Sequence, residues 1–161
     1  MTETLLHKTP LGEVTLAASG DALIGLWFRG QKYELATLKG ERLENPDSAL
    51  LREAARWVDA YFEGRYPDPG ALPLKPVGTP FRERVWQQLL RIPYGATTTY
   101  GALAQALDRP GGAQAVGGAV GHNPISIIIP CHRVLGADGA LTGYAGGLER
   151  KQALLRLERE V

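Results

Sequence analysis

A dense cluster of prolines near the middle of the chain constrains the fold more than any other feature. Because proline fixes φ and lacks a backbone N–H, neither a helix nor the interior of a sheet continues through residues 66–80. We therefore expect an interdomain linker over residues 66–78, an N-terminal domain over residues 1–65 and a C-terminal domain over residues 79–161. The prolines concerned are Pro67, Pro69, Pro73, Pro76 and Pro80.

The sequence before the linker predicts a small sheet covered by one helix. Residues 13–18 and 22–28 are apolar runs around Ser19-Gly20-Asp21, which is typical of a β-hairpin, and residues 3–7 can add a third strand. Between residues 46 and 64 the apolar positions follow helical spacing, so we expect one amphipathic helix packed on the hairpin. This part shows no cluster of reactive side chains, and we expect it to serve as a scaffold.

The sequence after the linker predicts several helices. Thr79-Pro80 is a favourable helix start, and helical patterns cover residues 79–91, 100–107, 113–121 and 148–161. The second and third of these, joined by a Gly-containing turn, form a helix-turn-helix candidate, although an ordinary αα-hairpin fits the same pattern. The two parts together predict an α+β fold.

The predicted helix over residues 113–121 is unusually smooth. Gly117 and Gly118 lie inside it, and each glycine costs about 1 kcal/mol relative to alanine. Such a cost suggests that another structure packs closely against the backbone of this helix, either a neighbouring helix or the floor of a nucleic-acid groove. Gln114 is the polar side chain that protrudes from this surface.

Composition and charge exclude several classes of protein. The chain is 44% hydrophobic and 22% charged, as in an ordinary globular protein. It has no apolar run of membrane-spanning length and no signal segment, so we expect a cytoplasmic protein with no membrane partner. A net charge of +1 excludes a polycation that coats nucleic acid. Residues 1–78 carry 9 basic and 11 acidic side chains, whereas residues 79–161 carry 9 basic and 6 acidic ones. This small excess of positive charge favours an anionic partner for the second half, although a difference of this size also arises by chance.

Cys131 is the single cysteine, so no internal disulfide forms and we expect no structural zinc site. Residues 126–129 are a β-branched run that predicts a buried strand, which Pro130 ends just before the thiol. A neighbouring imidazole such as that of His132 can activate a thiol nucleophile. A lone cysteine is also often only a small buried apolar side chain, and the sequence pair alone does not decide between the two.

Glu158 shares a predicted helix face with Leu154, Leu155 and Val161. A carboxylate on that apolar side requires a partner, and an imidazole or a guanidinium would serve. The alternative is a solvated carboxylate at the edge of a frayed helix end.

Several motifs in order resemble the O6-alkylguanine-DNA alkyltransferases, also called methylated-DNA–protein-cysteine methyltransferases. The reactive signature is Ile129-Pro130-Cys131-His132-Arg133-Val134. The supporting motifs are Thr79-Pro80-Phe81, Trp86, Tyr94-Gly95, Ala115-Val116-Gly117-Gly118-Ala119, His122-Asn123-Pro124, Thr142-Gly143-Tyr144-Ala145-Gly146-Gly147 and Lys151. The resemblance covers about residues 79–158, and the sequence before it is compatible with the family's variable N-terminal domain.

The resemblance implies a DNA-repair protein with a winged helix-turn-helix that binds in the minor groove of double-stranded DNA and flips out an O6-alkylguanine. The cysteine thiolate takes the alkyl group by direct displacement and is not regenerated, so each molecule reacts once. The sequence leaves activity on O4-methylthymine open. We expect a monomer, with no metal because the zinc site of some relatives needs more cysteines, and with no cofactor because the sequence shows no cofactor-binding fingerprint.

Roles for individual residues follow from the resemblance by position. Cys131 is the acceptor, His132 activates it through a water, Glu158 orients His132, and Asn123 braces the site by hydrogen bonds. Tyr100 lies where the family places a hydroxyl that helps to rotate the nucleotide and to protonate the leaving base.

The remaining roles concern the DNA and the base pocket. Val134, Tyr144 and Ala145 are implied to line the pocket. Gln114 stands where the family usually has an arginine that fills the gap left by the flipped base. Glutamine is shorter and uncharged, so this departure concerns the opening of the duplex rather than the alkyl transfer.

Two other function classes compete with this interpretation. A lesion sensor of the same fold would bind alkylated DNA and recruit other proteins, but that class has the cysteine replaced. A cysteine hydrolase would need an oxyanion hole and a substrate cleft, and the sequence shows no signature of either.

Overall fold

The computed structural model describes residues 1–109 and 112–159, and its contacts divide the chain into two compact units. The N-terminal unit comprises Met1–Val77 together with Pro124–Ile128, and the C-terminal unit comprises Gly78–Asn123 together with the chain from Ile129 onward. The fold is α+β, as predicted, with a sheet in the first unit and mainly helices in the second. The expected boundaries at residues 65 and 78 stay a prediction.

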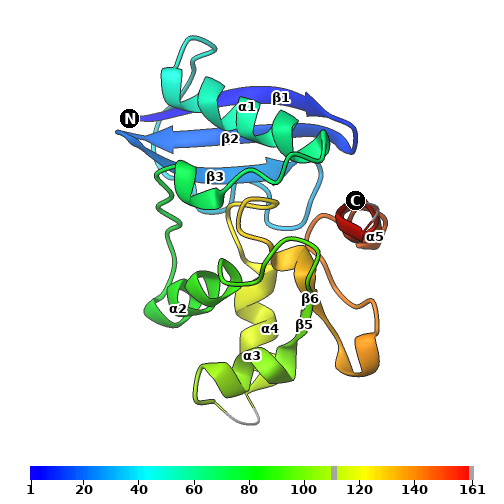
Figure 1. Cartoon of the computed structure of the whole chain (residues 1–161). Helices are drawn as coiled ribbons and strands as arrows, with labels where there is room; N and C mark the ends of the chain where they lie inside the picture. Colours follow the sequence, from blue (N-terminus) through cyan, green and yellow to red (C-terminus); the bar gives the residue numbers. More distant parts are fainter. Residues whose placement is uncertain (110–111, 160–161) are drawn as a thin grey trace. The chain divides into compact units, whose positions relative to one another are not determined.

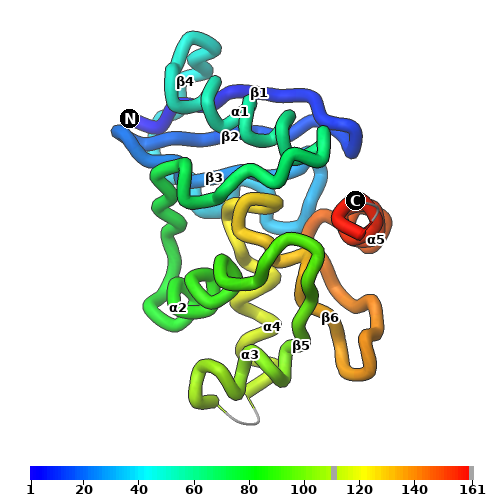
Figure 2. The backbone as a smooth tube through the Cα atoms, viewed as in Figure 1, coloured from blue at the N-terminus to red at the C-terminus, as the bar shows by residue number. Residues whose placement is uncertain are grey.

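The N-terminal unit is a four-stranded sheet covered by one long helix (Figure 1). The strand order is β3-β2-β1-β4, with antiparallel pairing except that β4 runs parallel to β1 at the edge (Figure 2). The hairpin, the third strand and the covering helix are all confirmed. The elements are β1 (Thr2–Thr9), β2 (Gly12–Ser19), β3 (Ala22–Phe28), β4 (Arg42–Glu44) and α1 (Ala49–Phe62).

Local signals set the ends of α1. The Ser48 side chain accepts a hydrogen bond from the Leu51 N–H at 3.3 Å, which satisfies one of the free amides of the first turn. Gly64 follows the helix with φ of +77°, the left-handed conformation in which glycine commonly ends a helix. The buried side of α1 carries Leu51, Ala54, Trp57, Val58 and Tyr61.

The proline-rich stretch is more ordered than a free linker. It contains a short 3₁₀-helix at Pro69–Ala71 and a parallel bridge between Leu74 and Leu23 of β3. Pro73 keeps its carbonyl and accepts from the Leu23 N–H at 2.7 Å, and the Lys75 N–H donates to the Leu23 carbonyl at 2.8 Å. Proline removes a donor but not an acceptor, so alternating prolines still allow one side of this ladder to form.

The C-terminal unit contains the four predicted helices and a short two-stranded sheet (Figure 1). Thr79 caps α2 through a side-chain hydrogen bond, as the sequence predicts, and Thr99 caps α3 in the same way. The helices α3 and α4 pack against each other, as expected of the helix-turn-helix candidate. The elements are α2 (Pro80–Leu89), β5 (Thr98–Thr99), α3 (Tyr100–Ala106), α4 (Ala113–Gly121), β6 (Val134–Leu135) and α5 (Leu148–Arg159).

Trp86 fixes α2 against the end of α4. Its indole Nε1–H donates to the Ala119 carbonyl at 2.8 Å, and its side chain is fully buried. The ring lies so close to Gly78 that any Cβ at that position would overlap it. The end of α4 is thereby held in place immediately before Asn123.

The predicted strand over residues 126–129 is wrong. Only Ile125 forms a strand-like bridge, to Leu26, and the residues after it turn. Ile127 adopts φ of +71°, and the Ile128 N–H donates to the Ser126 carbonyl at 2.8 Å, which closes a γ-turn. All of these residues are buried, so burial rather than extended structure explains the apolar run.

No helix in the described part of the chain has the length and hydropathy to cross a bilayer.

Candidate active site

Cys131 lies at the start of a 3₁₀-helix, Cys131–Arg133, and is 4% exposed. Pro130 has φ of −82° and ψ of 64°, and the Cys131 N–H donates to the Ile129 carbonyl at 2.8 Å. These values describe an inverse γ-turn, whose φ matches the angle that the proline ring imposes. A sharp, rigid turn therefore precedes the thiol, although the preceding segment is not the strand that the sequence predicted.

Burial dominates the electrostatics of the thiol. It raises the pKa of Cys131 to about 11, because a thiolate is poorly solvated in the interior. A hydrogen bond with the Asn123 side chain and the positive charge of Lys151 act in the opposite direction. The resting group is therefore a neutral thiol surrounded by groups that favour its ionised form.

His132 and Glu158 form a buried pair. His132 Nε2 and Glu158 Oε2 are 2.6 Å apart, and both side chains are almost completely shielded from solvent. Burial lowers the pKa of His132, although Glu158 opposes this effect, so the imidazole is neutral at pH 7. A carboxylate only accepts hydrogen bonds, and Nε2 must therefore carry the proton of the neutral ring.

Arg133 completes the environment of Glu158. Its Nε donates to Oε1 at 2.8 Å and its second terminal nitrogen donates to Oε2 at 3.2 Å, a two-pronged ion pair. The remaining terminal nitrogen of Arg133 donates to the Ile92 carbonyl at 2.7 Å, and the Gly95 N–H donates to Glu158 Oε1 at 3.1 Å. The carboxylate thus has the guanidinium and imidazole partners that its apolar helix face required.

Lys151 is a second buried cation. It lies on the same face of α5 as Glu158, and its Nζ donates to the carbonyls of Val134, Thr142 and Gly143 at 2.6, 2.5 and 3.0 Å. Burial lowers the pKa of Lys151 to about 8, although negative charge on Cys131 would raise it. Its three donors tie the chain after Cys131 to the loop over residues 142–143.

Asn123 connects α4 to the turn before the thiol. It lies two residues after the end of α4 and is 3% exposed, and its Nδ2 donates to the Ile129 carbonyl at 2.8 Å. The same carbonyl accepts from the Cys131 N–H. Asn123 therefore contacts both the backbone turn and the sulfur.

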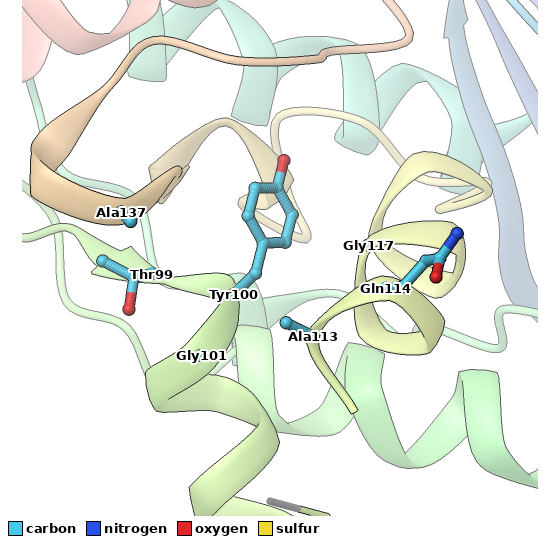
Figure 3. Close-up of a pocket in the computed structure, with 7 residues that line it drawn as sticks. All are labelled: Thr99, Tyr100, Gly101, Ala113, Gln114, Gly117 and Ala137. Carbon is cyan, nitrogen blue, oxygen red and sulfur yellow. The ribbon is translucent and has the colours of Figure 1, made fainter. Parts of the chain in front are cut away.

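A pocket of about 580 Å³ opens between the start of α3, the start of α4 and the turn at Ala137 (Figure 3). Tyr100 projects into it from the first residue of α3, and Gln114 lies at its edge in the first turn of α4 (Figure 3). Gln114 is exposed, as predicted. Gly117 lines the same pocket, and a Cβ there would lie 3.7 Å from the Tyr100 ring. Gly118 has no such neighbour in the described part of the chain.

Tyr100 also interacts with groups outside this pocket. Its hydroxyl hydrogen-bonds the Thr142 side chain, and burial together with negative charge at Cys131 raises its pKa. Val134 is fully buried in β6. Tyr144 and Ala145 are half-buried in the loop whose Thr142 carbonyl accepts a hydrogen bond from Lys151. Every predicted site residue lies in the C-terminal unit. The roles assigned to them stay predictions.

Arg133 and Lys151 were not predicted as site residues. A signal for Lys151 was present, because positions 151, 154, 155 and 158 form the buried stripe of α5. Arg133 offered a weaker signal, a cation placed between His132 and the apolar pair Val134-Leu135. The described residues contain no group of three or more His, Cys, Asp or Glu side chains that could hold a metal ion.

Two known family models together match nearly the whole chain. The 6-O-methylguanine DNA methyltransferase DNA-binding domain matches residues 80–160, and the ribonuclease-like domain of 6-O-methylguanine DNA methyltransferase matches residues 1–76. The methylated-DNA–protein-cysteine methyltransferase of Mycobacterium tuberculosis strain H37Rv is 47% identical over 152 residues, which cover 94% of this chain and 88% of that protein. That of Haemophilus influenzae is 42% identical over 153 residues, which cover 95% and 84%.

Solved structures give the same result. The crystal structure of Mycobacterium tuberculosis OGT in complex with DNA matches with a TM-score of 0.88 at 43% identity. The match covers 98% of this chain and 93% of that one.

Proposed function

This chain belongs to the 6-O-methylguanine DNA methyltransferase family, and from that premise we propose that it repairs DNA by moving the alkyl group of O6-alkylguanine onto its own Cys131. Its activity is that of a methylated-DNA–protein-cysteine methyltransferase. One observation carries the assignment of the acceptor. The reaction requires a protein cysteine, and Cys131 is the only cysteine in the sequence.

The proton of the thiol has one route within the site. Glu158 engages Nε2 of the neutral imidazole, so Nδ1 is the ring nitrogen that can take the proton of Cys131, directly or through a water. The imidazolium that forms is stabilised by the Glu158 carboxylate. The raised pKa of Cys131 means that this transfer accompanies the arrival of the substrate rather than preceding it.

The transfer is a direct displacement. The thiolate sulfur forms a bond to the alkyl carbon while the bond between that carbon and the guanine O6 breaks. The guanine anion takes a proton from the Tyr100 hydroxyl, the Tyr100 phenolate recovers a proton from solvent, and the thiol proton passes from His132 to solvent, so no net proton is gained or lost. The products are an S-alkyl cysteine and an unmodified guanine. The site holds no group that would cleave a thioether, so each molecule reacts once and irreversibly.

The DNA is bound by the α3–α4 pair. In this proposal α4 lies in the minor groove, the alkylated base is flipped into the pocket beside Tyr100, and Gln114 occupies the space that the base leaves. Of the predicted site residues, Tyr100 and Gln114 line this pocket of about 580 Å³, which lies within the range of small-molecule sites, whereas Cys131 is not among its lining residues. In the proposal, Val134, Tyr144 and Ala145 contact the base once it reaches Cys131. We propose a cytoplasmic monomer that also accepts O4-methylthymine and uses no cofactor.

Mass spectrometry of the intact protein tests the assignment. After incubation with duplex DNA containing one O6-methylguanine, the wild type should gain one methyl group on Cys131, with a yield that never exceeds one per protein molecule. Cys131→Ser should gain none and should bind the same DNA with unchanged affinity, since phosphate contacts supply most of the binding energy.

Other outcomes of this experiment identify the competing functions. Binding of the lesion without a change in mass would indicate a sensor, and repaired DNA with unmodified protein would indicate turnover. Methyl transfer by Cys131→Ser would refute the assignment of the nucleophile.

A further inference from the structure

Residues 124–128 are held by the N-terminal unit, although they lie between two segments of the C-terminal unit in the sequence. The Leu26 N–H donates to the Pro124 carbonyl at 2.8 Å, and the Ser126 N–H donates to the Leu26 carbonyl at 2.9 Å. Leu26 belongs to β3, so one edge of this strand binds the segment with two backbone hydrogen bonds. The segment ends at Ile128, three residues before Cys131.

The backbone conformation of this segment is unfavourable in free energy. Ile127 is a β-branched residue with φ of +71° and is almost completely buried. A residue held in this region costs about 1–3 kcal/mol and persists only where its surroundings fix it. The bonds to Leu26 supply part of that fixation.

Gln31 supplies a further part through its side chain. It is buried, and its Oε1 accepts from the Phe28 N–H at 2.7 Å and from the Ser126 hydroxyl at 3.5 Å. Its Nε2 donates to the Lys32 carbonyl at 3.1 Å. One buried side chain therefore fixes the end of β3 and contacts the segment that β3 binds.

Few degrees of freedom separate this anchor from the thiol. Ile129 and Pro130 are the residues between Ile128 and Cys131, and Pro130 has a ring-restricted φ. The Ile129 carbonyl is held by both Asn123 Nδ2 and the Cys131 N–H. Four residues therefore separate Ser126 from Cys131 along the chain, and the last two of them are restrained by the Pro130 ring and by the bonds to the Ile129 carbonyl.

We propose that Gln31 is a positioning residue for the alkyl transfer, acting through Ser126 and the 124–128 segment on the placement of Cys131. The N-terminal unit then contributes to the rate of the chemical step and is more than the scaffold that its sequence suggested. The proposal rests on Cys131 as the acceptor. The expected loss of transfer rate follows from the sensitivity of displacement reactions to geometry, because a shift of the reacting atoms by about 1 Å lowers the rate by up to 10²-fold.

The test compares Gln31→Leu with Val58→Ala in the full-length protein. Val58→Ala removes buried apolar volume from α1, which packs on β1, β2 and β3 in the same unit, so it controls for a general loss of stability. For each variant we would measure the transfer rate at saturating duplex DNA containing O6-methylguanine, the affinity for that DNA, and the alkylation rate of Cys131 by iodoacetamide without DNA.

Gln31→Leu should slow transfer at saturating DNA about tenfold, with DNA affinity within twofold of the wild type and a changed iodoacetamide rate. Gln31→Glu keeps the acceptor oxygen for Phe28 and Ser126 but loses the donor to the Lys32 carbonyl, so it should recover part of the transfer rate that Gln31→Leu loses. Val58→Ala should leave the transfer rate within twofold. A transfer rate in Gln31→Leu that equals that of Val58→Ala would overturn the proposal. Failure of the acceptor assignment is distinguishable, because the wild-type protein itself would then gain no methyl on Cys131.

Discussion

Glu158→Gln changes the buried carboxylate into a neutral amide of the same shape. The carboxylate accepts from His132, from two nitrogens of Arg133 and from the Gly95 N–H. The amide keeps one acceptor oxygen and replaces the other by an NH₂ group, which must face a donor or a ring nitrogen. Two separate losses follow, one of stability and one of the transfer rate.

The stability loss comes from Arg133. Its side chain is 9% exposed and that of Glu158 is 1% exposed, so the substitution leaves a buried cation without its counter-ion. Breaking a buried pair on one side costs about 3–5 kcal/mol. At about 2–4 °C per kcal/mol for a chain of this size, Tm should fall by roughly 6–20 °C.

The rate loss comes from His132. An amide NH₂ facing Nε2 donates to it and moves the ring proton to Nδ1, the nitrogen that must accept the thiol proton. Loss of a general base lowers rates by about 10²–10⁴-fold. The transfer rate at saturating DNA should fall by this amount, with DNA affinity unchanged.

A second variant separates the two effects. Arg133→Met with Glu158→Gln removes both charges, so denaturant unfolding should show most of the stability restored, since an apolar replacement of a buried pair is often neutral. The transfer rate should stay low, because His132 still lacks its carboxylate. If the double variant were no more stable than Glu158→Gln, or if transfer recovered along with stability, the reasoning would be wrong.

Three further perturbations have defined outcomes. Gln114→Arg should raise the ratio of duplex to single-strand repair rates at fixed salt, because arginine fills the vacated base position better and single strands need no flipping; a constant or lower ratio would contradict this. Methylation of Cys131 should lower Tm, since a carbon added to a fully packed thiol costs about 1–3 kcal/mol; a Tm that is unchanged or raised would refute it. Gly78→Ala should cost a similar amount in denaturant unfolding, because the new Cβ displaces the Trp86 ring and strains its hydrogen bond to Ala119; wild-type stability would show that the ring can shift freely.

The helices were predictable because their ends are encoded locally. Thr79 and Thr99 cap α2 and α3, and Gly64 follows α1 in a left-handed conformation, so each boundary depends on residues a few positions apart. The predicted partner of Glu158 also followed from local information, since helical spacing placed a carboxylate among leucines. Val161, the other residue of that predicted face, lies outside the described residues.

The segment before the thiol was not predictable in this way. Three consecutive isoleucines favour a strand, and nothing nearby in the sequence shows that Ile127 turns with positive φ. That conformation is imposed by Leu26 and Gln31, about a hundred positions earlier in the chain. Arg133 escaped prediction for a related reason, because its partner Glu158 is distant in the sequence and guanidinium groups are usually exposed.

The burial of Cys131 has a consequence for a protein that is consumed by its own reaction. Under the proposed stoichiometric mechanism, any electrophile or oxidant that modifies the thiol removes a repair molecule as surely as a lesion does. A thiol that is 4% exposed and has a pKa of about 11 is a poor target for such reagents in free solution. The buried site therefore limits inactivation by reagents other than alkylated DNA. Under this mechanism the number of alkylated protein molecules reflects the number of lesions repaired rather than reaction with other electrophiles in the cell.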